Sequence, residues 1–268
     1  MRMPALALLC LMIASPAAFA FDKDDMAKLK ETGSCAGCDL RAAKLQSEDF
    51  TDAYMKGANL RDTILKGIKL ENANLANADL RRADLEKSNL TNANLESAIM
   101  QGADLEKAVM KGADLRQTDL RDTDFESADV EGGKFQKADL RKASFKRANL
   151  SKANFSDTNL KDANFKRATM VDTIFVDAEL KDANFARANL TNARLDGAEL
   201  GHSNFHRATL VGANLAGADV SDAAFWGADL SGANLKDTEG LEQQQLDVAC
   251  GDKKTLLPND LLISDCPG

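Results

Sequence analysis

The sequence contains few of the residues that commonly carry catalysis, and few aromatic residues of any kind. Its 268 residues include 2 histidines, 1 tryptophan and 1 tyrosine, and aromatic residues make up 5% of the chain. It has no H-E-x-x-H zinc motif, no G-x-S-x-G nucleophile motif and no phosphate-binding glycine loop. The two histidines, His202 and His206, are expected to point outward on successive sides of the surface. We therefore expect no catalytic residue, no cofactor and no bound metal.

Proline is missing from the whole middle of the chain. The four prolines lie towards the two ends, at Pro4, Pro16, Pro258 and Pro267. Proline has no backbone N–H, so it is excluded wherever every N–H must join a hydrogen-bonded ladder. The composition is otherwise that of an ordinary soluble protein, with 44% hydrophobic and 28% charged residues and a formal net charge of −8. The middle of the chain is therefore predicted to be one unit with continuous backbone pairing.

A strict five-residue period extends from residue 38 to residue 237. Every residue whose number is divisible by five, from Leu40 to Leu235, has a large apolar side chain, which makes forty consecutive matches. Two residues before each of them lies a small residue, with Glu48 and Ile68 as the exceptions. On an α-helix the apolar side chains would spread around the whole surface, and on a straight strand they would alternate between faces. The chain must therefore turn a corner once in five residues, as in a repeat array that buries its apolar side chains by stacking.

The repeats follow the consensus A-(D/N)-L-x-x, as in residues 58–62 (ANLRD) and 83–87 (ADLEK). In this consensus, over residues 38–237, the chain resembles the pentapeptide-repeat family. The resemblance implies an all-β solenoid, a right-handed quadrilateral β-helix with four repeats per coil and about ten coils. At about 4.8 Å per coil, the rod would be roughly 48 Å long.

Two features of the repeats agree with that fold. Ten of the 17 glycines follow the central apolar residue by two positions, where the chain would turn a corner. At twenty residues per coil, one core column is formed by Phe125, Phe145, Phe165, Phe185, Phe205 and Phe225, and the opposite column contains Phe135, Phe155 and Phe175. We expect a rod with a Leu-rich N-terminal half and a Phe-packed C-terminal half.

Residues 1–20 are typical of a signal peptide. Arg2 precedes a short apolar run, and Ala18-Phe19-Ala20 matches an A-x-A cleavage site. The run is too short to span a membrane, so no transmembrane segment is expected. The alternative is a buried N-terminal element with an accidental A-x-A. We predict cleavage after Ala20 and a mature protein that is periplasmic or secreted.

Short helical caps are predicted at both ends of the rod. Residues 22–31 have acidic side chains early and lysines late, and Gly33 follows them, which is typical of a short helix. Residues 239–250 are also compatible with a helix. The predicted organisation is a signal peptide at 1–20, an N-terminal helical cap at 21–37, the repeats at 38–237, and a C-terminal helical cap with a disulfide-tied tail at 238–268.

The predicted mature chain has four cysteines, Cys35, Cys38, Cys250 and Cys266. An even count in an exported protein favours disulfides. The sequence allows three connectivities, of which we favour the two local pairs. Cys35 and Cys38 also form a CxxC, which leaves a thiol redox or metal-binding role as an alternative. Against that role, Cys38 falls on the inward column of small residues, and the chain has no second CxxC.

Surface charge is the remaining indication of function. One side of the predicted coil mixes acidic and basic residues, which is typical of a solvated, self-neutralising surface. The next side is acidic at Asp84, Glu86, Asp104, Glu106, Asp124 and Glu126, and then basic at Lys146, Arg147, Lys166, Arg167, Arg187 and Arg207. We interpret the basic residues as a surface for an anionic partner, an acidic protein or an anionic glycan of the cell envelope. The alternative is a column that only balances the charge of an acidic chain.

We interpret the chain as a non-catalytic structural or protein-binding rod of the bacterial cell envelope, or periplasm. No nucleic-acid partner is predicted. The resemblance suggests an alternative, because some pentapeptide-repeat proteins are similar to duplex DNA in shape and charge and bind the topoisomerase DNA gyrase. The predicted export and the rows of lysine and arginine favour the envelope hypothesis. The identity of the partner and the oligomeric state stay open at this stage.

Overall fold

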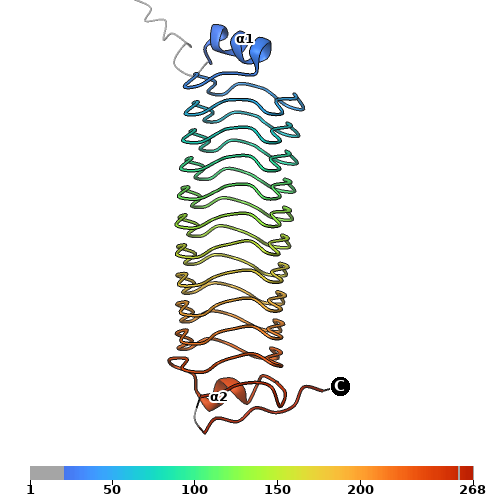
Figure 1. The fold of residues 1–268 in the computed structure, drawn as a ribbon, viewed down its shortest axis with the longest axis vertical. Helices are drawn as coiled ribbons and strands as arrows, with labels where there is room; N and C mark the ends of the chain where they lie inside the picture. Colours follow the sequence, from blue (N-terminus) through green and yellow to red (C-terminus); the bar gives the residue numbers. More distant parts are fainter. Residues whose placement is uncertain (1–20, 259, 268) are drawn as a thin grey trace, which may run out of the picture.

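The five-residue period builds a long four-sided rod with a helix at each end (Figure 1). The structure is a computed structural model that describes residues 21–258 and 260–267. Helix α1 spans Lys23–Thr32 and helix α2 spans Gln243–Leu246. Neither of these helices of the described chain is long and apolar enough to cross a membrane. The predicted signal peptide, residues 1–20, lies outside the described residues.

Each coil of the rod contains twenty residues. The residue before each central apolar residue forms a parallel β-bridge with the residue twenty positions later, as in Asp39↔Asn59 and Asn59↔Asp79. The bridges follow this spacing without interruption from Ser34 to Glu239, which makes about ten coils. The ladder thus begins four residues before the predicted start of the repeats, within the segment assigned to the N-terminal cap.

Every backbone N–H of a typical repeat has an acceptor, as residues 58–62 show. The N–H groups of Asn59, Leu60 and Asp62 donate to carbonyl oxygens of neighbouring coils at 2.7–3.0 Å. The N–H of Ala58 closes the preceding turn onto the carbonyl of Met55, and the N–H of residue 61 donates to the Asn59 side chain at 3.3 Å. This pattern explains the absence of proline and the preference for Asp or Asn before the central residue, because a buried or half-buried N–H without an acceptor is costly.

The corners are left-handed turns in all forty repeats. The residue two positions after each central apolar residue, from Ala42 to Asp237, has φ between 53° and 68°. Ten of these residues are the glycines noted in the sequence, which confirms their expected place at corners. The other thirty have side chains, among them arginines and lysines, although this region favours glycine and then Asn or Asp. The ladder therefore imposes a conformation that costs the thirty corner residues some strain.

The large apolar residues fill the rod in four columns, and the expected change from leucine to phenylalanine is confirmed. In one column the rings of Phe125 and Phe145 stack with centroids 4.6 Å apart, and stacking continues to Phe225 at 4.8–5.1 Å. In the opposite column Phe135 and Phe155 stack at 4.4 Å. Rings of the two columns meet edge to face at 5.8–6.3 Å. Both geometries are favourable for aromatic pairs, so the ladder stabilises this half beyond simple burial.

The two exceptions in the small-residue column have separate structural reasons. The side chain of Glu48 is only partly buried and forms an ion pair with Lys30 of α1, with Nζ and Oε1 2.9 Å apart. Ile68 lies one coil further along the same column and is 1% exposed. Glu48 therefore contributes to the contact with the N-terminal helix, and Ile68 fills the core below it.

The two ends of the rod differ in how well the sequence predicts them. Helix α1 begins after Asp22, whose side chain accepts the N–H groups of residues 24 and 25, and it ends at Gly33 with φ 64°, as expected. At the other end the expected helix over 239–250 is too long, because α2 has only four residues. The chain there continues the ladder instead, through the bridges Asp229↔Cys250 and Asn234↔Leu256. Pairing therefore outlasts the sequence period by about one irregular coil.

Candidate interaction surface

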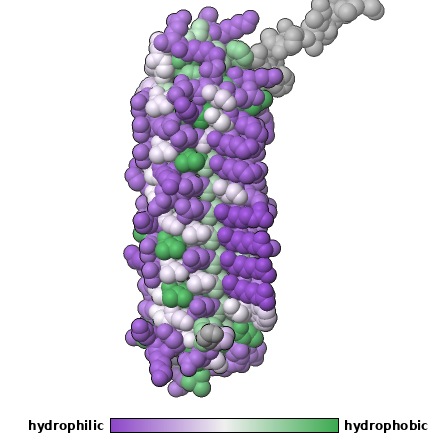
Figure 2. Space-filling view, turned by 90° about the vertical axis from the view of Figure 1, so that its right-hand side faces the viewer, coloured by the Kyte–Doolittle hydropathy of each residue, from purple (hydrophilic) through white to green (hydrophobic). Residues whose placement is uncertain are grey.

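The basic residues of the sequence form a continuous column on one corner of the rod. Arg147, Arg167, Arg187 and Arg207 occupy the same left-handed corner position of four successive coils, with φ between 56° and 63°. All four side chains are exposed. The stacked phenylalanine rings of these coils are about 5 Å apart, so the arginines repeat at that interval along the rod. Figure 2 shows one face of the rod, on which strongly hydrophilic side chains stack in successive rows.

We call the residues 84–87, and those at every twentieth position from them up to 204–207, the graded side. Its net charge per coil runs −1, −1, −2, +2, +2, +1 and +1 from residues 84–87 to residues 204–207. The change of sign lies between Glu126 and Lys146. There Arg147 crosses to the preceding coil and pairs with Glu126, with Nη1 and Oε1 2.5 Å apart.

The rest of the basic half of the graded side carries unpaired charge. Among the residues that the structure describes, no carboxylate lies within 4.0 Å of the charged groups of Lys146, Lys166, Arg167, Arg187 or Arg207. The neighbouring side of the rod, which contains residues 119–122 and those at every twentieth position from them, is different. There Arg121 and Arg141 each donate two hydrogen bonds to the aspartate two residues earlier. These arginines lower the pKa of Asp119 and Asp139. The neighbouring side is thus self-neutralised around Arg121 and Arg141, whereas most cations of the basic half have no carboxylate partner in the described chain.

A hollow lies within the basic half. It has a volume of about 340 Å³ and is lined by Glu126, Lys146, Arg147, Lys166 and Arg167. Four of these five lining side chains are cations, and three of those four have no carboxylate partner in the described chain. Such a concavity with convergent cations attracts anionic groups and concentrates them near the surface.

An aromatic residue ends the basic column. The indole of Trp226 stacks on the imidazole of His206 with centroids 4.4 Å apart and planes 12° apart. The guanidinium carbon of Arg207 lies 4.9 Å from the centre of the indole ring, which is a cation–π distance. The indole is nonetheless 47% exposed. Trp226 follows His206 by twenty residues, and this spacing is the signal for the contact in the sequence.

A second hollow, of about 540 Å³, extends from Trp226 to the C-terminal cap. Its wall includes residues 221–226 of the last regular coil, Glu242 immediately before α2, and Val248 after α2. Gln245 of α2 holds the cap to the coil, because its side-chain amide donates to the carbonyl oxygens of Val220 and Ala223 at 2.9 Å. Val248 is 45% exposed. The basic column therefore ends in an open, partly apolar concavity.

The acidic half of the graded side is partly neutralised by nearby lysines. The Lys66 ammonium, followed by that of Lys87, lowers the pKa of Glu86 to about 2. Lys107 pairs with Glu106. Asp104 differs, because burial and the like charges of Asp84 and Asp124 raise its pKa. The acidic half thus retains a row of aspartates that lack a cation.

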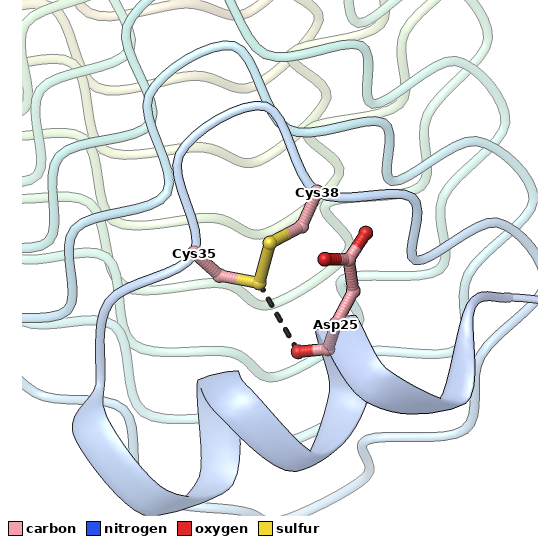
Figure 3. Close-up of side chains that lie close together, drawn as sticks. All are labelled: Asp25, Cys35 and Cys38. Atoms are coloured by element: carbon pink, nitrogen blue, oxygen red, sulfur yellow. Dashed lines mark hydrogen bonds between the residues drawn. A yellow bond between two sulfur atoms is a disulfide. The ribbon is translucent and has the colours of Figure 1, made fainter.

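The four cysteines form the two local disulfides, Cys35–Cys38 and Cys250–Cys266. The first lies at the mouth of the rod below α1, with the carbonyl oxygen of Asp25 3.2 Å from Sγ of Cys35 (Figure 3). The second ties the C-terminal tail to the irregular coil, and Asp229 approaches Cys266 at 3.2 Å. Each pair lies near one aspartate, and the three residues together could hold a metal ion. Because the sulfur atoms of each pair are bonded to each other, such a site would need reduced thiols. The alternative of a redox or metal role rests on that reduction.

The histidines are not brought together. The ring of His202 lies 3.7 Å from the carboxylate of Asp222, and His206 is stacked on Trp226. Neither belongs to a group of potential metal ligands within the described residues.

Comparison with known proteins places the repeats in one family. The family description "Pentapeptide repeats (8 copies)" matches residues 34–72, 73–112, 88–126, 98–136 and 198–237, and "Pentapeptide repeat region" matches residues 138–215. No curated protein matches the chain. Members of this family form right-handed quadrilateral β-helices and are generally non-catalytic.

Several solved structures are similar to the chain. HetL, a pentapeptide repeat protein involved in heterocyst differentiation regulation from the cyanobacterium Nostoc sp. strain PCC 7120, is 30% identical; the match covers 80% of this chain and 92% of HetL, with a TM-score of 0.32. Rfr23 from the cyanobacterium Cyanothece 51142 is 30% identical over 41% of this chain and 63% of its own, with a TM-score of 0.26. QnrB1, a plasmid-mediated fluoroquinolone resistance protein, is 21% identical over 79% and 92%, with a TM-score of 0.37. On its repeats, this chain belongs to the pentapeptide repeat protein family.

Proposed function

We propose that this protein is a non-catalytic, rod-shaped binding protein of the bacterial cell envelope whose basic half holds an anionic partner. The observation that carries the proposal is the column of four arginines at successive corners, which continues into the Trp226 stack. Arginine at a left-handed corner is less favourable than the glycine found at ten other corners. The backbone therefore gives no reason for four arginines in succession, whereas an anionic ligand does.

The chemistry of the surface favours an extended anionic partner. Cations spaced at about 5 Å over four coils match a chain with repeated negative groups better than a single small anion. Arginine binds carboxylates and phosphates through two parallel hydrogen bonds, which gives such a contact direction as well as charge. Trp226 and the adjoining hollow supply an apolar contact at one end.

Binding to envelope extracts tests this function. The purified chain is immobilised beside an Arg167→Asp/Arg187→Asp variant, in which aspartate suits the left-handed corner. The matched control is Lys161→Asp/Lys181→Asp, which makes the same charge change on the neighbouring side. We expect the arginine variant to lose a defined set of retained molecules that the control keeps. Identical sets for all three proteins would refute the proposal.

Cell fractionation tests the proposed location. We expect the protein in the periplasmic or secreted fraction with its N-terminus at Phe21. Full-length protein in the cytoplasm, with residues 1–20 intact, would contradict the envelope proposal.

A further inference from the structure

The backbone pairing of the rod has a gap at the C-terminal end of the graded side. In the described chain the other three sides continue into the irregular coil, through the bridges Asp219↔Glu239, Asp229↔Cys250 and Asn234↔Leu256. The graded side stops at Ala224, which pairs back to Asn204 and has no onward bridge among the described residues. Residue 244, which the twenty-residue spacing would pair with Ala224, lies in helix α2 below the last coil (Figure 1).

The gap leaves two backbone donors without an acceptor. The N–H of every other central apolar residue donates to a carbonyl oxygen of the next coil at 2.6–2.9 Å, whereas that of Phe225 has no acceptor among the described residues. The corner residues from Ala42 to Gly217 donate to the next coil in the same way. Within the described chain, the N–H of the next corner residue on this side, Asp222, has no acceptor either. Such an open edge is a template for pairing with another extended chain.

The edge lies in the hollow beside the C-terminal cap. Asp222 and Phe225 both line this hollow of about 540 Å³. The side-chain amide of Gln245 already donates to the carbonyl oxygens of Val220 and Ala223. The edge therefore offers N–H donors, and the group that completes it must supply acceptors.

The charges of the wall decide which acceptor fits. The charged residues of the wall are Asp222 and Glu242, and neither has a lysine or arginine within 4.0 Å in the described chain; His202 lies 3.7 Å from Asp222. These carboxylates repel an anion, accept the neutral carbonyl groups of a peptide, and attract a lysine or arginine side chain. Trp226 and Val248, which are 47% and 45% exposed, add apolar surface to the same wall.

We propose that an extended segment of a partner protein, with a lysine or arginine among its side chains, adds to the rod in this hollow as the missing strand. Its carbonyl oxygens accept the N–H groups of Asp222 and Phe225. Its cation lies beside Asp222 and Glu242, and an apolar side chain packs on Trp226 and Val248. In strand addition the main-chain hydrogen bonds supply affinity and the side-chain contacts supply specificity. The site goes beyond the anionic partner of the basic half, because its own charged residues are acidic.

Amide hydrogen exchange of the purified chain, followed by NMR, tests this site. The probe is a short acetylated and amidated peptide of alternating valine and lysine. In the free protein we expect the N–H of Phe225 to exchange faster than that of Phe205, which donates to the carbonyl of Ala224 at 2.8 Å. Saturation with the peptide should slow exchange at Asp222 and Phe225 by about tenfold or more and leave Phe205 unchanged.

Two variants separate the contacts of the peptide. Val248→Arg places a cation of the rod in the hollow and should abolish the response at Phe225. The matched control Ile99→Arg changes another exposed aliphatic residue, 39% exposed, and should respond like wild type. Asp222→Asn/Glu242→Gln keeps the side-chain oxygens and removes both charges, so affinity for the peptide should fall about fivefold, as for two exposed charge pairs.

Exchange at Phe225 that is as slow as at Phe205 in the free protein, or that the peptide does not change, would overturn the proposal. Slowing that depends on protein concentration without peptide would assign the gap to a second copy and refute the partner segment. Arg167→Asp/Arg187→Asp should keep the response at Asp222 and Phe225, so failure of the anionic partner leaves this site standing. Loss of the response in that variant would merge the site with the arginine column and refute it.

Discussion

The two halves of the rod share one backbone and differ in almost everything that the backbone does not require. Coils before residue 125 are packed with leucine and methionine, and later coils contain two columns of stacked phenylalanine. The graded side changes from acidic to basic at nearly the same point. Both halves nevertheless keep the same twenty-residue bridges and left-handed corners. The ladder and the small inward residues therefore determine the fold, and the outward residues are free to differ for other reasons.

A charged side chain in the core should prevent stable folding in either half of the rod. Leu160→Asp and Leu80→Asp each place a carboxylate at a position that is 0% exposed, where it has neither water nor a partner. Because each coil is stable only through its neighbours, we expect loss of cooperative thermal unfolding, measured by circular dichroism, for both variants. A folded Leu160→Asp protein would show that the inward column is assigned wrongly.

Truncation of a core side chain to alanine should lower the free energy of unfolding more in the phenylalanine half than in the leucine half. Phe165 stacks on Phe145 and Phe185 at 5.1 and 5.0 Å, whereas Leu85 lies in the same column among leucines. We expect Phe165→Ala to lower the free energy of unfolding by about 4 kcal/mol and Leu85→Ala by about 3 kcal/mol, measured by denaturant titration. An equal or smaller cost for Phe165→Ala would mean that the ring stacks add nothing to burial.

The two disulfides provide a comparison of the rod ends. The Cys250–Cys266 bond has a sequence separation of 16 and closes a longer loop than Cys35–Cys38, with a separation of 3. In the chain-entropy description the replacement of both cysteines by alanine costs about 3 kcal/mol at the C-terminal end and about 2 kcal/mol at the N-terminal end. Native-state hydrogen exchange should show faster opening of residues 229–256 in the first variant. Unchanged exchange there would indicate that α2 and the irregular ladder suffice.

The smallest expected effects are electrostatic, and they have opposite signs. Burial, together with the charges of Asp84 and Asp124, raises the pKa of Asp104. The contribution of Asp104 to stability is therefore present below the pKa of the unfolded chain, about 3.9, and is lost as pH rises. Asp104→Asn keeps the side-chain oxygen that accepts the N–H of Glu106, and it should raise the melting temperature at pH 7. Asp139, whose pKa Arg141 lowers, contributes stability that is lost as pH falls.

The matched variant Asp139→Asn should therefore lower the melting temperature at pH 7 and have less effect near pH 3. Shifts of the same sign for both variants at pH 7 would contradict the charge distribution described for the two sides.

The sequence predicts the regular part of the fold because every repeat has the same pattern of buried and corner residues. Forty central residues and their small neighbours locate the core, and the glycines locate the corners. The period fails where contacts are specific to one place. Glu48 breaks the pattern because it pairs with Lys30, and the ladder continues past Asp237 although the residues of the irregular coil no longer repeat.

The candidate surface is predicted only in outline for a similar reason. Sequence spacing alone brings the basic residues of the graded side into one column. Which charges pair depends on side-chain reach, so the contact of Arg147 with Glu126 is visible only in the structure. The Trp226 contact with His206 and Arg207 obeys the twenty-residue spacing, but the sequence gives no sign that one indole serves both residues.

The most direct test of the central claim, that the basic half is the interaction surface, is site-specific photo-crosslinking in cells. A photoreactive residue replaces Arg187 in the column, or Lys181 on the neighbouring side of the same coil, and adducts are compared by blotting and mass spectrometry. We predict a defined adduct from position 187 and none from position 181, and an adduct of twice the chain mass would identify a second copy. Equal adducts from both positions, or none from position 187, would contradict the claim.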